Sequence, residues 1–159
     1  MLGRKNKGFT LVEILIVVII LGILAAIVIQ QFTSASQDAR RSSMASTVQS
    51  LRSQIELYKL QHNDTVPNLT ASWDPLMTVT LPDGTASTLG TAGAVGPYMQ
   101  AIPTNPFLTG AAASTVTSCT GTPTADGSCG FYQDLSTGKI WGAAPNPDTT
   151  AGGWVVVGD

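Results

Sequence analysis

The sequence is poor in the side chains that most often carry catalysis and metal binding. Its 159 residues include one histidine and two cysteines, and only 11% of them are charged. No Ser–His–acid set and no group of metal ligands can be assembled from so few residues, which argues against an enzyme. The sequence also lacks a phosphate-cradling loop of the GxxxxGK type, which argues against a nucleotide-driven motor. We therefore expect a structural or binding protein without a resident cofactor.

Positive charge is scarce beyond the first eight residues. Arg4, Lys5 and Lys7 lie there, and without them five Lys or Arg remain against ten Asp or Glu, a net charge of −5. Nucleic-acid binding proteins usually present a basic surface. The mildly acidic remainder therefore argues against a nucleic-acid partner.

One segment holds most of the hydrophobicity. Residues 14–29, ILIVVIILGILAAIVI, contain no charged side chain. A helix from Phe9 to Ile29 spans roughly 30 Å at about 1.5 Å per residue, which matches the hydrocarbon core of a bilayer. The basic residues before it favour a cytoplasmic start. We predict a transmembrane helix over residues 9–30.

Two ordinary explanations for this segment fit it poorly. A secretory signal is cleaved after its apolar run, behind small residues, yet further apolar residues follow Ala25 and Ala26. An ordinary signal anchor gives no reason for Glu13. A carboxylate costs about 2.5–3.5 kcal/mol at the centre of a membrane helix and less near an end. Such an acid usually has a function and a partner.

The stretch KGFTLVE at residues 7–13, between basic residues and the apolar run, resembles the N-terminal signal of type IV pilins and type II secretion pseudopilins. In that family a membrane-embedded aspartyl protease cuts after the glycine and N-methylates the new terminus. The resemblance implies a leader peptide of residues 1–8, cleavage between Gly8 and Phe9, and methylation of Phe9. It also implies that Glu13 pairs with the Phe9 ammonium of a neighbouring subunit. Because removing one member of a buried ion pair is strongly unfavourable, this pair sets the register between subunits.

A helical pattern continues beyond the apolar run. No proline occurs before Pro67, and the family's frequent proline after the run is replaced here by Gln30, which makes a kink less expected. We predict one continuous helix to about His62, with residues 31–63 as its amphipathic half and His62 solvated or capping at its end. Apolar residues recur at spacings of 4, 3, 4 and 3 and form a stripe that should carry a soluble domain: Met44, Val48, Leu51, Ile55 and Tyr58.

The remaining residues, 64–159, are rich in turn formers and form the predicted head. Short β-prone runs occur at residues 77–81 and 154–157, and residues 130–134 and 139–142 flank a turn with Gly138. We predict an α+β fold in which the long N-terminal helix packs on a small C-terminal antiparallel sheet. Two of the three tryptophans are expected to be buried.

Cys119 and Cys129 lie nine positions apart within this head. A metal site would want a closer pair or more ligands, so in an exported protein a disulfide is the simpler interpretation. The head is also similar in style to major pseudopilins, through GPY at residues 96–98 and IPTNPF at residues 102–107. Major pseudopilins often bind calcium in a C-terminal loop. The candidate ligands here are Asp126, Asp134 and Asp148, but they form no tight acidic cluster, so calcium binding is only a weak hypothesis.

The resemblance implies a filament subunit that polymerises with itself. It is expected to sit in the inner membrane as a single-pass protein with a periplasmic head, and then in a periplasmic or cell-surface filament. Its expected partners are the lipid bilayer, the prepilin peptidase, an inner-membrane assembly platform and minor pseudopilins. We expect a major pseudopilin of type II secretion. A type IV pilus pilin for adhesion, motility or DNA uptake is the alternative, and a surface-binding module that does not self-assemble is a third.

Overall fold

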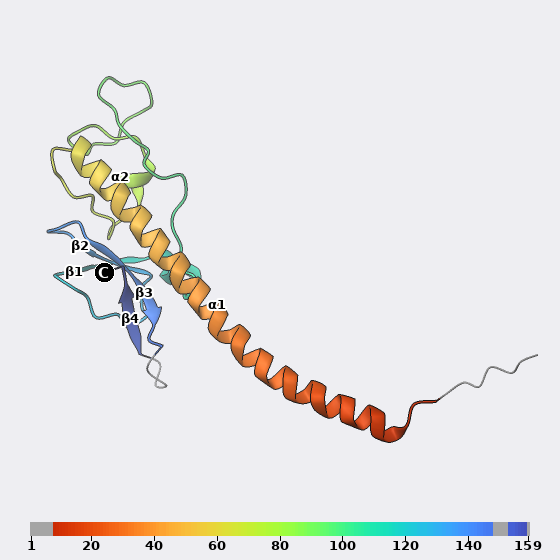
Figure 1. Cartoon of the computed structure of the whole chain (residues 1–159). Helices are drawn as coiled ribbons and strands as arrows, with labels where there is room; N and C mark the ends of the chain where they lie inside the picture. Colours follow the sequence, from red (N-terminus) through yellow and green to blue (C-terminus); the bar gives the residue numbers. More distant parts are fainter. Residues whose placement is uncertain (1–7, 148–152, 159) are drawn as a thin grey trace, which may run out of the picture. The chain divides into compact units, whose positions relative to one another are not determined.

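The computed structural model, drawn in Figure 1, describes residues 8–147 and 153–158, with the side chain of Gln30 left out. The chain divides into two compact units, one ending at Ala39 and the other beginning at Arg40. Helix α1, Leu11–Gln61, belongs to both. The predicted long helix is confirmed, with ends that differ by one or two residues.

The end of α1 is set by backbone conformation. Asn63 and Asp64 have left-handed φ angles of 53° and 62°, which a helix cannot continue through. The Asp64 N–H donates to the Lys59 carbonyl at 2.9 Å and thereby satisfies one of the last carbonyls of α1. The chain then turns back along the head.

Four strands form one sheet in the order β1-β2-β3-β4. Their bounds are Val116–Cys119 for β1, Phe131–Asp134 for β2, Ile140–Pro145 for β3 and Trp154–Val157 for β4. β2, β3 and β4 pair antiparallel, as the predicted hairpin and final strand require. β1 pairs parallel with β2, so the α+β fold is confirmed but the sheet is mixed rather than purely antiparallel.

The predicted strand at residues 77–81 is wrong. Helix α2, Asp74–Met77, occupies its start, because Pro75 suits the first turn of a helix. Only Thr80 makes β-type contacts there, as isolated bridges to Ala86 and Val95. A short 3₁₀ helix, η1, follows at Gly110–Ser114.

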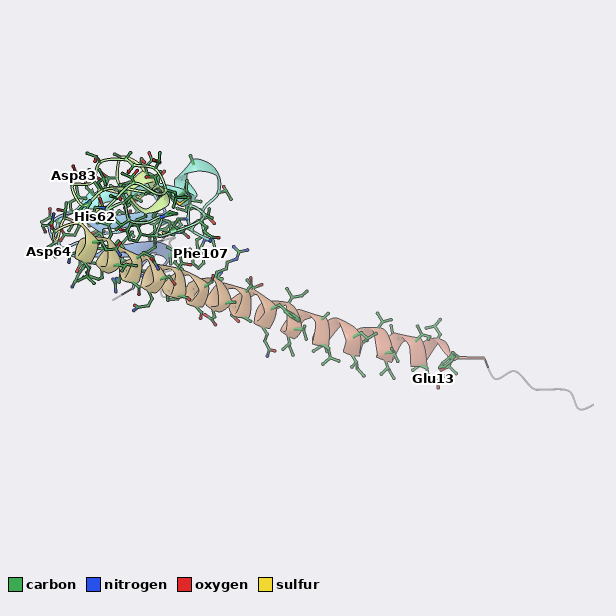
Figure 2. The ribbon with its side chains drawn as sticks, turned by 90° about the horizontal axis from the view of Figure 1, so that it is seen from above. Glu13, His62, Asp64, Asp83 and Phe107 are labelled. Carbon is green, nitrogen blue, oxygen red and sulfur yellow. The ribbon has the colours of Figure 1, made fainter. Side chains whose placement is uncertain are left out.

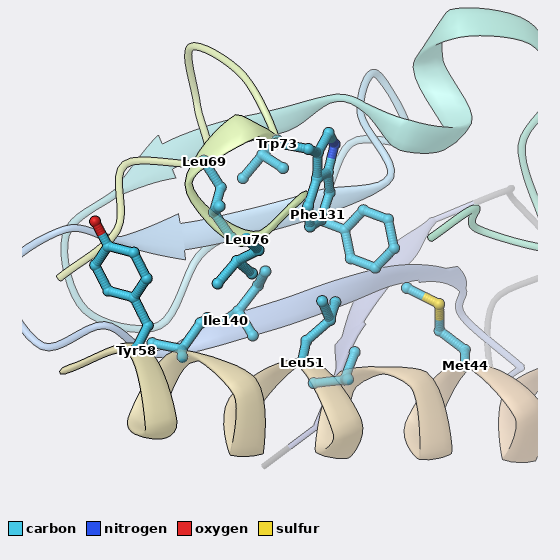
Figure 3. Close-up of a cluster of buried hydrophobic side chains, with 11 residues drawn as sticks. Met44, Leu51, Tyr58, Leu69, Trp73, Leu76, Phe131 and Ile140 are labelled. Carbon is cyan, nitrogen blue, oxygen red and sulfur yellow. The ribbon is translucent and has the colours of Figure 1, made fainter. Parts of the chain in front are cut away.

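The core lies between the second half of α1, α2 and the sheet (Figure 3). All five stripe residues are at most 4% exposed, which confirms the predicted stripe. Leu51 and Met44 of α1 face Phe131 and Ile140 of the sheet (Figure 3). Burying each such side chain contributes about 1.5–3 kcal/mol. Two tryptophans, Trp73 and Trp141, are buried as expected.

Candidate functional site

The start of α1 is organised by a reciprocal pair of side chains. The Thr10 N–H and Thr10 hydroxyl both donate to Oε2 of Glu13 at 2.9 Å, and the Glu13 N–H donates to the Thr10 hydroxyl oxygen at 3.2 Å. This is a capping box, in which the first residue and the fourth satisfy each other's free backbone groups. Sequence reasoning assigned Glu13 only an assembly role, although the T-x-x-E spacing before an apolar run signals this cap.

Both hydrogen bonds to Glu13 end on one carboxylate oxygen. Among the residues that the structure describes, Oε1 has no partner. An ionised carboxylate offers about four acceptor positions. Glu13 can therefore cap its own helix and still accept an ammonium group from elsewhere. Figure 2 shows Glu13 at the first turn of α1.

The apolar part of α1 is exposed in the single chain. Every large apolar side chain of α1 from Leu11 to Ile29 is at least 44% exposed. This helix is long and apolar enough to cross a membrane. Gly8 and Phe9, at the predicted cleavage site, are exposed as well. Phe9 itself is 82% exposed in the single chain.

These first residues decide the comparison with known proteins. Residues 3–29 match the family model described as the prokaryotic N-terminal methylation motif. The chain carries a prepilin-type N-terminus. No solved structure gives a significant match to the chain.

The curated relatives show likeness over a longer part of the chain than this motif. The chain is 39% identical over 61 residues to the type II secretion system core protein G of Pectobacterium carotovorum, which covers 38% of this chain and 39% of that protein. It is 39% identical over 59 residues to the protein of that name from Pseudomonas aeruginosa, covering 37% and 42%. With the protein of that name from Vibrio cholerae it is 33% identical over 75 residues, covering 47% and 51%. The matched region thus spans about two fifths to one half of these relatives.

Two arginines fix the second half of α1 to the sheet. Arg52 donates through Nε and Nη2 to the Ile140 carbonyl at 3.1 and 2.9 Å. Arg41 donates to the carbonyl of Pro145 at the other end of the same strand. Glu56, four residues after Arg52 on α1, pairs with Lys59 at 3.3 Å.

Of the two predicted roles of His62, solvated or capping, the structure shows the capping one, since its ring bonds to one of the last carbonyls of α1. His62 is fully buried and stacks on Tyr58 with ring centroids 3.7 Å apart. Its Nδ1 lies 2.9 Å from the Tyr58 carbonyl and its Nε2 lies 2.9 Å from the Thr80 hydroxyl. A carbonyl only accepts, so Nδ1 donates and Nε2 accepts in the neutral ring. His62 therefore joins the end of α1 to the segment around Thr80, and Figure 2 shows it at this end of the head.

The two cysteines belong to one small cluster beside the sheet. Cys129 is buried, and Cys119 packs against the same group of residues. Both are free thiols in the structure. Burial, aided by the Asp134 carboxylate and by Cys129, raises the pKa of the Cys119 thiol above its usual value. The disulfide stays a prediction, and the shared cluster is compatible with it.

The two described calcium candidates are occupied by local hydrogen bonds. Ser136 donates its hydroxyl and its N–H to Asp134, and with the Gly121 N–H these bonds lower the Asp134 pKa to about 2. The hydroxyl and N–H of Ser128, followed by the Tyr132 hydroxyl, lower the pKa of Asp126 to about 2. Asp148 lies outside the described residues, and among those described no three acids, histidines or cysteines gather as metal ligands. The described residues thus give no support to calcium binding.

Proposed function

We propose that the chain is the structural subunit of a pilus-like filament, the major pseudopilin of a type II secretion system, and that it has no catalytic activity. An exposed apolar helix with an acid in its first turn, lying within the matched methylation motif, carries this proposal. The names of the curated relatives favour secretion over the type IV pilus alternative.

Maturation follows from the motif. The prepilin peptidase removes residues 1–8 by cutting between Gly8 and Phe9, and then methylates the Phe9 amine. Residues 9–30 anchor the chain in the inner membrane, residues 31–63 connect them to the head, and residues 64–159 complete the head in the periplasm. The subunit then leaves the membrane through an assembly platform, together with minor pseudopilins.

Glu13 acts in the step that joins one subunit to the next. The cut leaves an ammonium on Phe9, close in sequence to an apolar helix start where a bare charge is costly. Oε1 of Glu13 in an incoming subunit accepts that ammonium, while Oε2 keeps its bonds to Thr10. The helix therefore stays capped throughout assembly.

Maturation is tested by the mass of the protein itself. The chain is produced in a bacterium with an active prepilin peptidase and in the same strain without that enzyme. We expect the mature chain to lack eight residues and to gain one methyl group on Phe9 only when the enzyme is present. Retention of the first eight residues with an active peptidase contradicts the proposal.

The place in secretion is tested in the chain's own host. Deleting its gene should leave folded secreted proteins in the periplasm, and restoring the gene should release them. Unchanged secretion, with loss of surface pili instead, contradicts the secretion role and supports the pilin alternative.

A further inference from the structure

The peptide bond that is cut in the proposed maturation lies just outside α1, within the matched methylation motif. Gly8, Phe9 and Thr10 are exposed and form a short coil before Leu11, where the helix begins (Figure 1). The carbonyl of Gly8 and the N–H of Phe9, the two groups of this peptide, make no hydrogen bond to another described residue. A free peptide group is open to a protease, whereas one inside a helix is bonded and shielded by the next turn.

Crowding does not hold these residues out of the helix. A Cβ atom built on Gly8 meets nothing within 4 Å among the described residues. Phe9 is 82% exposed, and neither phenylalanine nor threonine is a strong helix breaker. The place where α1 starts is therefore not set by packing within the described chain.

The capping box diverts an N–H group that would otherwise draw the scissile peptide into α1. In a helix that began one turn earlier, each of these N–H groups would donate to the carbonyl four residues back. The Glu13 N–H would then bond to the Phe9 carbonyl. The Val12 N–H would bond to the scissile carbonyl of Gly8. In the structure the Thr10 hydroxyl oxygen accepts the Glu13 N–H instead, at 3.2 Å, and so replaces the Phe9 carbonyl as its partner.

A helix that starts in or beside lipid needs partners for its first N–H groups, because hydrocarbon offers none. The capping box supplies them for Thr10 and Glu13. Without the Thr10 hydroxyl, the acceptor that helical geometry offers the Glu13 N–H is the Phe9 carbonyl, which is reached by winding the helix back toward the leader. That winding brings the scissile peptide into the helix.

We propose that Thr10 is a positioning residue for leader cleavage, because its hydroxyl caps α1 and thereby keeps the Gly8–Phe9 peptide outside the helix. This rests on the proposed function, which supplies the cut. Hydrolysis adds water to the Gly8 carbonyl carbon and breaks its bond to the Phe9 nitrogen, leaving a carboxyl group on Gly8 and an amine on Phe9. The Thr10 side chain takes no part in these bonds and acts through the conformation of the substrate.

Initial rates of leader removal by purified prepilin peptidase, with the full chain in detergent micelles, test this role. Thr10→Val keeps the side-chain shape but removes the hydroxyl, and Thr10→Ser keeps the hydroxyl. We expect Thr10→Val to raise KM at least about fivefold with little change in kcat, because only the capped fraction of the chain binds productively. Thr10→Ser should stay within about twofold of the wild type. The matched control is Thr33→Val, which should be cut like the wild type, since the Thr33 hydroxyl donates to the Ile29 carbonyl well beyond the cut.

Phenylalanine-selective ¹³C labelling reports the conformation of Phe9 in the uncut chain without the enzyme. The chain has four phenylalanines, and the Phe9 signal is the one that moves when the leader is removed. We expect its Cα shift to be extended in the wild type and in Thr10→Ser, and to move toward the helical value in Thr10→Val.

Three results overturn the proposal while the proposed function stands. In the first, Thr10→Val is cut like the wild type. In the second, it is cut slowly although Phe9 stays extended, which makes Thr10 a contact of the enzyme instead. In the third, Thr10→Ser is as slow as Thr10→Val. A wild-type chain that the peptidase does not cut overturns both.

Discussion

At the scale of single residues, Glu13 caps α1 through one carboxylate oxygen, and we propose that the other oxygen serves assembly. Oε2 takes part in the capping box with Thr10, and Oε1 is free among the described residues. A capping box needs an acceptor at this position, which glutamine also supplies. Pairing with an ammonium needs the negative charge, which glutamine lacks. The two roles can therefore be separated by substitution.

Glu13→Gln should keep the capped helix start and lose assembly. We expect normal leader cleavage and at least tenfold fewer sheared fibres, because the ammonium of the neighbour loses its partner. Glu13→Leu should lose assembly as well, and with it the cap, because leucine has no acceptor for the Thr10 donors. Thr10→Ala is the control that weakens the cap, by about 0.5–2 kcal/mol, without touching the charge. Leader cleavage is measured by intact mass and fibre yield by electron microscopy. A wild-type fibre yield from Glu13→Gln would show that assembly does not need the negative charge of Glu13.

Asp134 makes the stability of the head sensitive to acid. Its folded pKa is held at about 2 by Ser136 and Gly121, below the value of about 3.9 of an unfolded aspartate. Because the unfolded state takes up the proton first, stability is complete above about pH 4 and is lost as the pH falls from there to about 2. The pKa of Asp126 is also lowered to about 2, so its contribution to the stability of the head is lost over the same pH range.

Asp134→Asn should make that acid loss shallower. The melting temperature of the full chain in detergent, followed by tryptophan fluorescence between pH 7 and 2, measures it. Asp74→Asn is the control, because its carboxylate accepts no hydrogen bond within the described residues. An acid slope unchanged by Asp134→Asn would assign the loss to other groups.

At the scale of elements, sequence periodicity predicts α1 and the hairpin well but misses the polar side chains that hold segments together. The stripe follows from apolar spacing alone, and β2 and β3 follow from β-prone runs around Gly138. β1 and the buried His62 depend instead on contacts with residues far along the chain. The pairing of Val116 with Phe131 leaves no periodic signal in the four residues of β1. The Thr10–Glu13 cap, by contrast, could have been predicted from the T-x-x-E spacing before the apolar run.

Gln133 of β2 ties the segment after α1 to the sheet. It is fully buried, its Oε1 accepts the Leu69 N–H at 3.0 Å, and its Nε2 donates to the Pro67 carbonyl at 2.8 Å. Gln133→Leu keeps the volume but leaves both backbone groups buried without partners, at about 1–3 kcal/mol each. We expect the free energy of unfolding to fall by about 2–6 kcal/mol in denaturant titrations. Gln49→Leu, on the exposed face of α1, should change it by less than about 0.5 kcal/mol.

At the scale of the whole molecule, the buried core lies in one unit of the chain and the exposed apolar run in the other. The described residues from Gly8 to Arg40 are exposed, whereas every buried residue lies at Met44 or beyond. The unit that begins at Arg40 therefore holds the whole core, including the buried stripe of α1. The unit that ends at Ala39 adds an apolar surface that needs lipid or other protein around it.

A chain shortened to begin at Arg40 should consequently fold by itself, stay monomeric and remain soluble. We expect its melting temperature to lie within about 5 °C of that of the full chain in detergent, because no described side chain of residues 8–39 is buried. Circular dichroism measures the fold, and sedimentation measures the mass. As a control, a chain that begins at Gln49 loses Met44 and Val48 from the core, at about 2–5 kcal/mol for each large side chain removed, and should melt far lower. If the chain that begins at Arg40 is unfolded, the first 39 residues serve the core. If it still forms fibres, assembly resides in the head.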